Sequence, residues 1–175
     1  GIKIGGITCD GDKSLLKAIR KVRPKVPVQR CLVHIQRMCK IWLSAYPKSV
    51  AGFELREIVC KLHFVDSEVK KQYWIKEFLD WFEKHKDFLN EKSYSLETGR
   101  YWYTHKMVRR CFSVIRKALP NMFTFLQNHK IPKTTNGIES FFGHLKGNLN
   151  IHRGLTKSRR KKFIQWYLFY KNLKS

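Results

Sequence analysis

The chain has 175 residues, enough for one domain with a sizeable core, and an apolar content of 43% with 14% aromatic residues argues against disorder. Its formal net charge of +23 costs stability through self-repulsion, which favours an anionic partner, with nucleic acid the first candidate and a membrane surface the second. No apolar run approaches the roughly 20 residues of a membrane-spanning helix, no basic amphipathic helix stands apart as an anchor, and five irregularly spaced cysteines indicate reduced thiols in an intracellular protein.

The first part of the chain predicts a strand, a helix and a second strand. Residues 2–9 form a short apolar run that ends at Asp10, residues 13–22 have apolar positions at helical spacing, and residues 28–33 form the next strand. Two strands that are joined by a single helix form a strand–helix–strand unit, in which the strands are expected to be parallel. Asp10 is therefore expected at the carboxyl end of a parallel strand, where open α/β sheets bind their ligands.

The remainder of the chain predicts helices. Trp74, Trp81 and Trp102 are interpreted as core residues of this helical part. The predicted helices cover residues 35–46, 50–62, 68–89, 106–119, 122–128, 137–149 and 156–173.

Most acidic residues lie in the middle of the chain, and three stand apart in its basic outer segments. Glu139 is the only acid between residues 98 and 175, a stretch that carries seventeen Lys and Arg. Asp10 and Asp12 are followed by ten basic residues before the next carboxylate, Glu54. In metal-dependent chemistry on a polyanion, cations hold the phosphates and carboxylates hold the metal. The pattern favours Asp10 and Glu139 as metal ligands.

Asp10 has two interpretations. It stands beside Gly11, which leaves room for a hard cation such as Mg²⁺ to reach the carboxylate. Alternatively, Asp10 caps the helix that begins near Lys13, because Asp is among the preferred capping residues. Asp12 is better placed for the cap and is the weaker candidate as a ligand. The sequence leaves both interpretations open.

Glu139 also has two interpretations. Asn136 and Glu139 fit a capping box, in which the glutamate side chain reaches back to the backbone N–H of the cap residue. Gly143, one helical turn after Glu139, leaves a gap beside the carboxylate and favours a ligand instead. The buried face of this helix is predicted to contain Ile138, Phe142, Leu145 and Leu149.

Cys31 and His34 form a Cys-x-x-His element at the end of the second strand. A structural zinc site needs a second pair of ligands at similar spacing, and although Cys39 is near, no such pair follows. The element is therefore interpreted as a packed or hydrogen-bonding pair in support of an active site. His34 is a candidate for orienting an active-site group.

The densest basic segment lies between residues 152 and 162. The cations of this segment have no acidic neighbours, which favours phosphate contacts over a solvated helix face. Trp166 and Tyr170 follow it; aromatic rings can stack on bases, but a spacing of four residues favours the protein core. The DNA-binding candidates are His152, Arg153, Lys157, Arg159, Arg160, Lys161 and Lys162.

Several segments resemble one known family. Residues 10–19 (Asp-Gly-Asp-Lys-Ser-Leu-Leu-Lys-Ala-Ile) and 29–37 (Gln-Arg-Cys-Leu-Val-His-Ile-Gln-Arg) resemble the second-Asp region of Mutator-type insertion-sequence transposases. Residues 134–142 (Thr-Thr-Asn-Gly-Ile-Glu-Ser-Phe-Phe) resemble the catalytic-Glu region of that family. Further resemblance lies in residues 47–55, 152–155, 159–160 and 166–168.

The resemblance implies an α/β fold that is mostly α in this chain: a partial RNase H-like core of short parallel strands and helices, with a helical insertion. Residues 1–46 would form the core part with the second catalytic Asp, residues 47–130 the insertion, and residues 131–175 the core helices with the catalytic Glu. Asp10 matches the second Asp and Glu139 the Glu of an Asp-Asp-Glu triad. Cys31 and His34 match the family's Cys-x-x-His element.

The implied function is DNA transposition by metal-dependent strand cleavage and strand transfer, with two Mg²⁺ (or Mn²⁺) ions about 3.5–4 Å apart at the carboxylates. The implied partners are double-stranded DNA and further copies of the protein, with no membrane, in the nucleoid of the bacterial cytoplasm. The family's first Asp would lie upstream of Gly1. The chain is thus expected to be an incomplete catalytic domain that binds DNA but does not cleave it.

Two other readings remain. One is a DNA-binding remnant of a transposase without catalysis, and the other is a basic ribosome-associated protein. The enzyme reading predicts that Asp10 and Glu139 converge at the carboxyl end of the parallel strands, because carboxylates more than about 10 Å apart cannot share a two-metal site.

Overall fold

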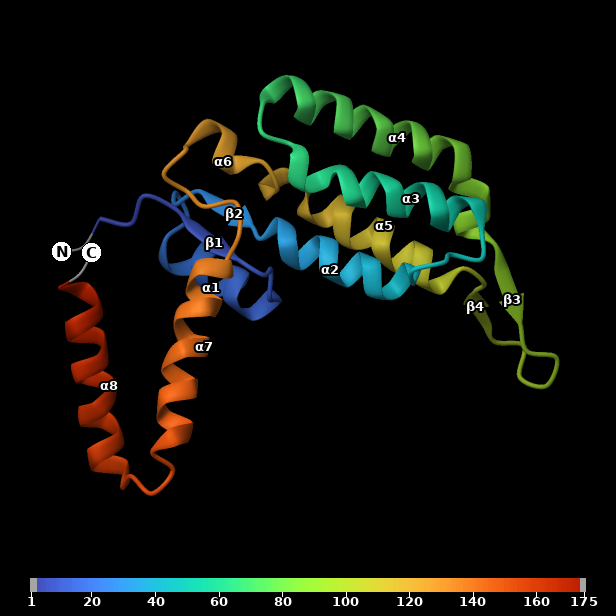
Figure 1. The fold of residues 1–175 in the computed structure, drawn as a ribbon. Coiled ribbons are helices and arrows are strands. Elements are labelled where there is room, and N and C mark those ends of the chain that lie inside the picture. The colour runs from blue at the N-terminus through green and yellow to red at the C-terminus, as the bar shows by residue number, and fades with distance from the viewer. Residues whose placement is uncertain (1–2, 174–175) are drawn as a thin grey trace. The chain divides into compact units, whose positions relative to one another are not determined.

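The computed structural model describes residues 3–173 and divides the chain into two compact units, Gly1–Thr135 and Asn136–Ser175 (Figure 1). The second unit contains α7 (Asn136–Ile151) and α8 (Lys157–Asn172). The first unit contains β1 (Ile7–Cys9), α1 (Lys13–Val22), β2 (Val28–Arg30), α2 (Leu32–Leu43), α3 (Val50–Lys61), the 3₁₀ turn η1 (Leu62–Phe64), α4 (Glu68–Asn90), β3 (Lys92–Tyr94), β4 (Tyr101–Tyr103), α5 (Lys106–Ala118), the 3₁₀ turn η2 (Leu119–Asn121) and α6 (Thr124–Gln127).

The predicted strand–helix–strand unit is present. β1 and β2 pair in parallel, with Cys9 opposite Arg30, and α1 connects them. The first strand is shorter than predicted, beginning at Ile7, and residue 2 of that prediction lies outside the described residues. β2 ends at Arg30 because Leu32 already begins α2. The mostly helical chain with short parallel strands is consistent with an α/β fold, whereas the RNase H-like core stays a prediction.

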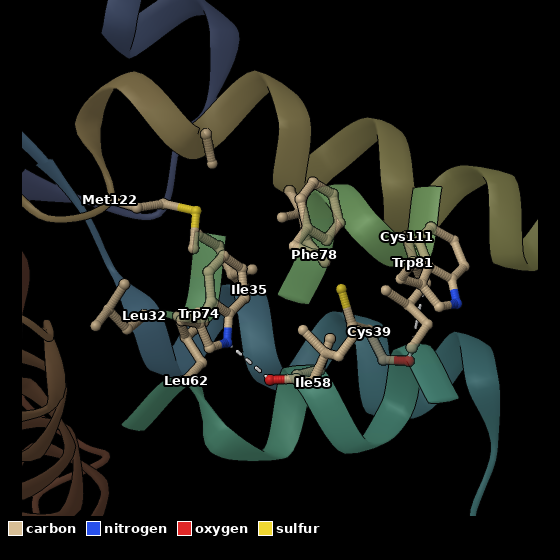
Figure 2. Close-up of a cluster of buried hydrophobic side chains, with 14 of the residues drawn as sticks. Leu32, Ile35, Cys39, Ile58, Leu62, Trp74, Phe78, Trp81, Cys111 and Met122 are labelled. Carbon is tan, nitrogen blue, oxygen red and sulfur yellow. Dashed lines mark hydrogen bonds between the residues drawn. The ribbon is translucent and has the colours of Figure 1, made fainter. Parts of the chain in front are cut away.

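The helical part is built around a core shared by α2, α3, α4 and α5 (Figure 2). Phe78 is fully buried at its centre, and its ring stacks on the rings of Trp74 and Trp81 at centroid distances of 5.7 and 6.1 Å. The Trp74 indole donates to the carbonyl of Ile58 at 2.8 Å, and the Trp81 indole donates to Ala51 at 3.0 Å. Both tryptophans are core residues, as predicted, and their polar N–H groups are satisfied.

The core is continuous across the boundary predicted at residue 46. Leu32, Ile35 and Cys39 of α2 pack in the same cluster as residues of α3, α4 and α5. The observed division of the chain falls later, after Thr135. The limits predicted for the catalytic core and the insertion stay predictions. None of the helices described between residues 3 and 173 is long and apolar enough to cross a membrane.

An antiparallel hairpin, β3–β4, connects α4 to α5 and was not predicted. Trp102 lies on it with 52% of its surface exposed, so its assignment to the core is wrong. Its strands have three residues each, which is too short for alternation of apolar and polar residues to reveal them.

The second unit is a helical hairpin in which α7 and α8 run side by side (Figure 1). Phe141 and Tyr167 meet across it with ring centroids 5.6 Å apart. Leu145 and Leu149 of the predicted buried face are buried, but the rest of that face is exposed. The core assignments that prove wrong in this unit are those of Ile138, Phe142, Trp166 and Tyr170.

Candidate active site at the end of the parallel strands

Asp10 lies directly after β1, and its side chain is exposed. Its Oδ1 accepts a hydrogen bond from the backbone N–H of Asp12 at 3.0 Å, and its Oδ2 takes none from any residue that the structure describes. The helix cap is Asp12, whose Oδ1 accepts from the Leu15 N–H at 2.8 Å. Because Asp12 caps α1, the interpretation of Asp10 as the helix cap is wrong, and its role as a metal ligand stays a prediction.

Gly11 turns the chain at the end of β1 and brings it against Arg30. Its φ of +92° is strained for any residue with a side chain, and a Cβ there would lie 1.8 Å from the Cζ atom of Arg30. The Arg30 Nη2 donates to the backbone carbonyl of Asp10 at 3.0 Å. The guanidinium and the glycine together therefore fix the backbone that carries the Asp10 carboxylate.

Arg30 is a buried cation without a counter-ion. It is 8% exposed, it forms no ion pair with the described residues, and its buried Nε donates to no protein atom. A buried guanidinium is costly when it lacks a partner, so an anion at this position would be stabilised. Burial raises the pKa of the neighbouring Cys9 thiol, although the Arg30 charge opposes this, so Cys9 is held as a neutral thiol.

Arg30 is not among the residues predicted for the site, although one signal for it was available. A parallel register that sets Cys9 opposite residue 30 brings residue 30 next to Asp10. The burial of the arginine has no such signal, because it depends on how the rest of the unit covers the strand pair.

Cys31 connects the strand pair to the segment that leads into α7. Its backbone N–H donates to the carbonyl of Cys9 at 2.8 Å. Its Sγ is fully buried and accepts hydrogen bonds from the backbone N–H and the hydroxyl of Thr135, both at 3.3 Å. Thr135 is the last residue of the first unit. Cys31 is therefore a hydrogen-bonded side chain that holds the chain just before the Glu139 helix.

Other contacts hold the same segment against the strand pair. The Thr8 hydroxyl donates to the carbonyl of Pro132 at 2.6 Å, and the Leu32 N–H donates to that of Lys133 at 3.1 Å. Ile131 is buried against Gly6, where a Cβ would lie 2.3 Å from its Cδ1. Residues 131–135 thus run alongside the strand pair toward the end where Asp10 lies.

His34 lies in the first turn of α2 and is half-buried. Within residues 3–173, no group of three or more His, Cys, Asp and Glu side chains is arranged to hold a metal ion. The structure thus supplies no further ligands for zinc at Cys31 and His34. The predicted role of His34 in orienting an active-site group stays a prediction.

Glu139 is exposed in the first turn of α7, in the second unit. The helix begins at Asn136, and a capping box between Asn136 and Glu139 stays a prediction. The distance from Glu139 to Asp10 is not fixed, because the two residues belong to different units. Their convergence stays a prediction.

The predicted DNA-binding residues lie at the turn between α7 and α8 and in the first half of α8, and all are exposed. Thr156 caps α8 by accepting from the Arg159 N–H at 3.4 Å, and no acid lies in the first turn. Cations at this end of a helix face the positive end of its dipole, which is unfavourable until an anion binds. The His152 ring packs on Phe163 at a centroid distance of 5.6 Å.

Comparison with known families matches residues 2–141 to the family described as "Transposase IS66 family". The matched range contains Asp10, Cys31, His34 and Glu139, and it ends before the basic segment. The assignment to the Mutator type is corrected by this match, which is to another insertion-sequence family. No curated protein and no solved structure matches the chain.

Proposed function

The chain belongs to the IS66 family of transposases, and from this premise we propose that it contributes Asp10 and Glu139 to a metal-dependent site for DNA strand cleavage and strand transfer. The family supports a transposase function in general. The chemistry at these two carboxylates is our proposal, and it is supported by how the chain between them is held.

The observation that carries the proposal is the bond between Thr135 and Cys31. Cys31 is hydrogen-bonded to Cys9, the residue before Asp10, and Glu139 follows Thr135 by four residues. A helix rises about 1.5 Å per residue, so four residues span about 6 Å along its axis. Thr135, the residue before the helix that carries Glu139, is therefore held beside the strand pair that ends at Asp10, and we propose that the Glu139 carboxylate converges with that of Asp10.

The donor set suits a hard divalent cation. Mg²⁺ and Mn²⁺ prefer carboxylate oxygens together with phosphate oxygens. Asp10 offers an exposed carboxylate with one oxygen outside protein hydrogen bonds, next to a glycine, and Glu139 would supply the second carboxylate. A bound metal polarises the scissile phosphate and lowers the pKa of a bound water. Asp10 and Glu139 are the residues that would hold it.

Arg30 has a positioning role in this proposal. Its bond to the Asp10 carbonyl and its contact with Gly11 hold the backbone from which the carboxylate projects. Its buried charge also favours an anionic group near the end of β1. Both effects act before DNA arrives, which is the preorganisation that charged transition states require.

The basic segment of α8 would hold duplex DNA by its phosphates and with little sequence preference. The unit from residue 136 onward contains nine Lys and Arg and a single acid, Glu139. Each phosphate neutralised adds roughly 0.9 to the slope of log affinity against log salt. Arg159→Ala with Arg160→Ala should flatten that slope by up to about two units and weaken unrelated duplexes alike.

The matched control removes two cations that already have partners. Lys70 is paired with Asp66 at 2.7 Å and Lys76 with Asp80 at 2.8 Å. Replacing both lysines by alanine should leave the salt slope unchanged. Equal slopes for both double variants, or a loss confined to one duplex, would contradict the assignment of phosphate contacts to α8.

We further propose that duplex DNA is the substrate, that several copies of the protein assemble on it, and that the protein acts in the bacterial nucleoid.

The proposed metal site at Asp10 and Glu139 is tested by Mn²⁺ titration followed by electron paramagnetic resonance. Asp10→Asn and Glu139→Gln should each weaken Mn²⁺ binding at least tenfold, because each removes one charged ligand. Asp12→Asn is the control, since asparagine also caps helices.

Two results separate the enzyme from its alternative. Loss of Mn²⁺ binding in both carboxylate variants, with duplex binding retained, supports the metal-dependent site. Duplex binding without Mn²⁺ binding in the unaltered protein would sink the proposed chemistry, and a non-catalytic DNA-binding remnant would take its place.

A further inference from the structure

A tyrosine-rich hairpin extends beyond the helical core of the first unit, at the ends of α4 and α5 (Figure 1). In its antiparallel register Lys92 lies opposite Tyr103, and Tyr94 lies opposite Tyr101. Gly99, with φ of +63°, allows the tight turn between the strands. Isolated two-stranded hairpins are marginally stable in water, so this one depends on its contacts with the helices.

The root of the hairpin is firmly attached. The His105 Nε2 donates to a carboxylate oxygen of Glu91 at 2.7 Å, and the His105 ring stacks on Phe88 at a centroid distance of 3.4 Å. The Arg109 guanidinium lies 3.5 Å from the centre of the Tyr103 ring and donates to the carbonyl of Leu89 at 2.9 Å. The base of the hairpin is therefore held in place by contacts with α4 and α5.

One side of the hairpin is a row of tyrosines flanked by cations. Paired positions of a two-stranded sheet project on the same side, so both tyrosine-containing pairs share one face. The Tyr101 ring is 6.2 Å from that of Tyr94 and 6.3 Å from that of Tyr103. The Nζ of Lys92 lies 4.3 Å from the centre of Tyr101. We call these residues the tyrosine face: Lys92, Tyr94, Tyr101, Tyr103 and Arg109.

The tyrosine face is open to solvent, and its charge is not neutralised. Tyr94 is 62% exposed and Tyr101 55%. Neither Lys92 nor Arg109 forms an ion pair with a residue that the structure describes, whereas the nearby Glu91 is already bonded to His105. The surface thus combines accessible aromatic rings with cations that need an anion.

We propose that the tyrosine face binds unpaired DNA bases, as a second DNA-contacting surface apart from the basic segment of α8. Bases with free faces stack on aromatic side chains while cations hold the adjoining phosphates, and such stacking tolerates any base. Inside a duplex each base is already covered by its neighbours, so intact duplex does not fit. The inference rests on the proposed function only in that strand cleavage and transfer expose DNA ends.

The test compares single-stranded with double-stranded DNA in the presence of EDTA. The probes are a thymine homopolymer and a mixed-sequence duplex of the same length. Tyr94→Ala with Tyr101→Ala should weaken binding of the single strand about tenfold or more, because each stacked base is lost, and should change duplex binding less than about twofold. Since no metal is present, failure of the site at Asp10 and Glu139 would not affect this result.

Two further variants control for exposure and for folding. Tyr46 and Tyr73 are 89% and 72% exposed and lie outside the hairpin, so their replacement by alanine should leave both affinities unchanged. Tyr94→Phe with Tyr101→Phe keeps the rings and should retain single-strand binding close to that of the unaltered protein.

Photo-crosslinking supplies an independent readout. A single strand that contains 5-iodouracil should crosslink to Tyr94 or Tyr101, as identified by mass spectrometry of the peptides. Unchanged single-strand affinity in the alanine variant, or an equal loss for single strand and duplex, would overturn the proposal. So would crosslinks confined to residues outside the hairpin, and the exposed face would then be a surface for protein contacts.

Discussion

The helical core and the strand pair of the first unit are stabilised in different ways. In the core, large apolar side chains pack around Phe78 (Figure 2). The indole N–H groups of Trp74 and Trp81 donate to backbone carbonyls. The strand pair has three residues in each strand and contains the two polar residues that are buried in the described part of the chain, Gln29 and Arg30.

Hydrogen bonds hold the strand pair in place. The Gln29 Nε2 donates to the carbonyls of Arg30 and Met122 at 2.6 and 2.7 Å, and its Oε1 accepts from the Phe125 N–H at 3.0 Å. The Thr124 hydroxyl donates to the carbonyl of Val28 at 2.8 Å. Stability therefore depends mainly on apolar packing, whereas the geometry around Asp10 depends on polar contacts. Substitutions in the two regions should have separable effects.

The largest effect on stability is expected from Phe78→Ala. Phe78 is fully buried, so its truncation leaves a cavity and should cost about 3–5 kcal/mol of the free energy of unfolding. Urea denaturation measures this loss. Leu79→Ala is the control, because Leu79 is 49% exposed and should cost much less. Similar losses for the two variants would contradict the packing described for the core.

Gln29→Leu should have the next largest effect. It leaves the Met122 carbonyl and the Phe125 N–H buried without a partner, and each such group costs about 1–3 kcal/mol. Hydrogen exchange should show faster opening of β2 and α6 than of α3 and α4. Uniformly faster exchange throughout the first unit would show that the strand pair and the helical core form one cooperative structure.

Arg30→Met is expected to weaken metal binding while it hardly changes the stability of the fold. The variant removes the cost of burying a charge without a counter-ion but also removes the donor to the Asp10 carbonyl, and because these effects oppose each other the free energy of unfolding should change by less than about 1 kcal/mol. Mn²⁺ binding should nevertheless weaken, because the Asp10 carbonyl loses its donor. Arg30→Lys should restore part of that affinity. Unchanged Mn²⁺ affinity in the methionine variant would remove Arg30 from the site.

The smallest effect concerns an ion-paired network between α3 and α4. Glu54 accepts from Lys84 at 2.6 Å and from His85 at 2.7 Å, and these bonds lower its pKa below the ordinary value of 4.5. A carboxylate with a lowered folded-state pKa stabilises the fold above its unfolded-state pKa and loses this contribution as the pH falls through the folded-state value.

Glu54→Gln should therefore cost about 0.5 kcal/mol near neutral pH, since the glutamate is partly exposed. The difference between the variant and the unaltered protein should vanish as the pH falls through the depressed pKa. Urea denaturation at a series of pH values measures it. A difference that persists unchanged into strong acid would mean that the effect is not electrostatic.

Most helix positions could be predicted well from the sequence, because capping residues and prolines mark their ends. The exception is α2, which begins and ends three residues before the predicted range 35–46 and has no side-chain cap. The helix predicted for residues 13–22 agrees with α1 at both ends, and that predicted for residues 68–89 differs from α4 by one residue. The hairpin could not be predicted, since alternation needs longer strands than three residues. Trp102 was misassigned for the same reason, because aromatic content alone does not distinguish a core from an exposed strand.

The candidate site was predictable only in part. The isolated carboxylates and the strand–helix–strand pattern identify Asp10 and its position at the strand end. The pattern does not reveal the buried Arg30, or the bonds from Thr135 to the Cys31 sulfur, because both depend on contacts between distant residues. Short motifs also did not separate one insertion-sequence family from another, so the Mutator assignment was wrong whereas the general class was correct.

The convergence of Asp10 and Glu139 is tested most directly by Fe²⁺-dependent cleavage of the protein backbone. With added hydrogen peroxide and ascorbate, Fe²⁺ substituted for Mg²⁺ reduces the peroxide to hydroxyl radicals, which cut the chain next to the metal ligands. Cuts are expected near both residue 10 and residue 139, and all of them should be lost in Asp10→Asn or in Glu139→Gln and retained in Asp12→Asn. Cuts near only one of the two residues, or cuts near residue 139 that persist in Asp10→Asn, would contradict a shared metal site.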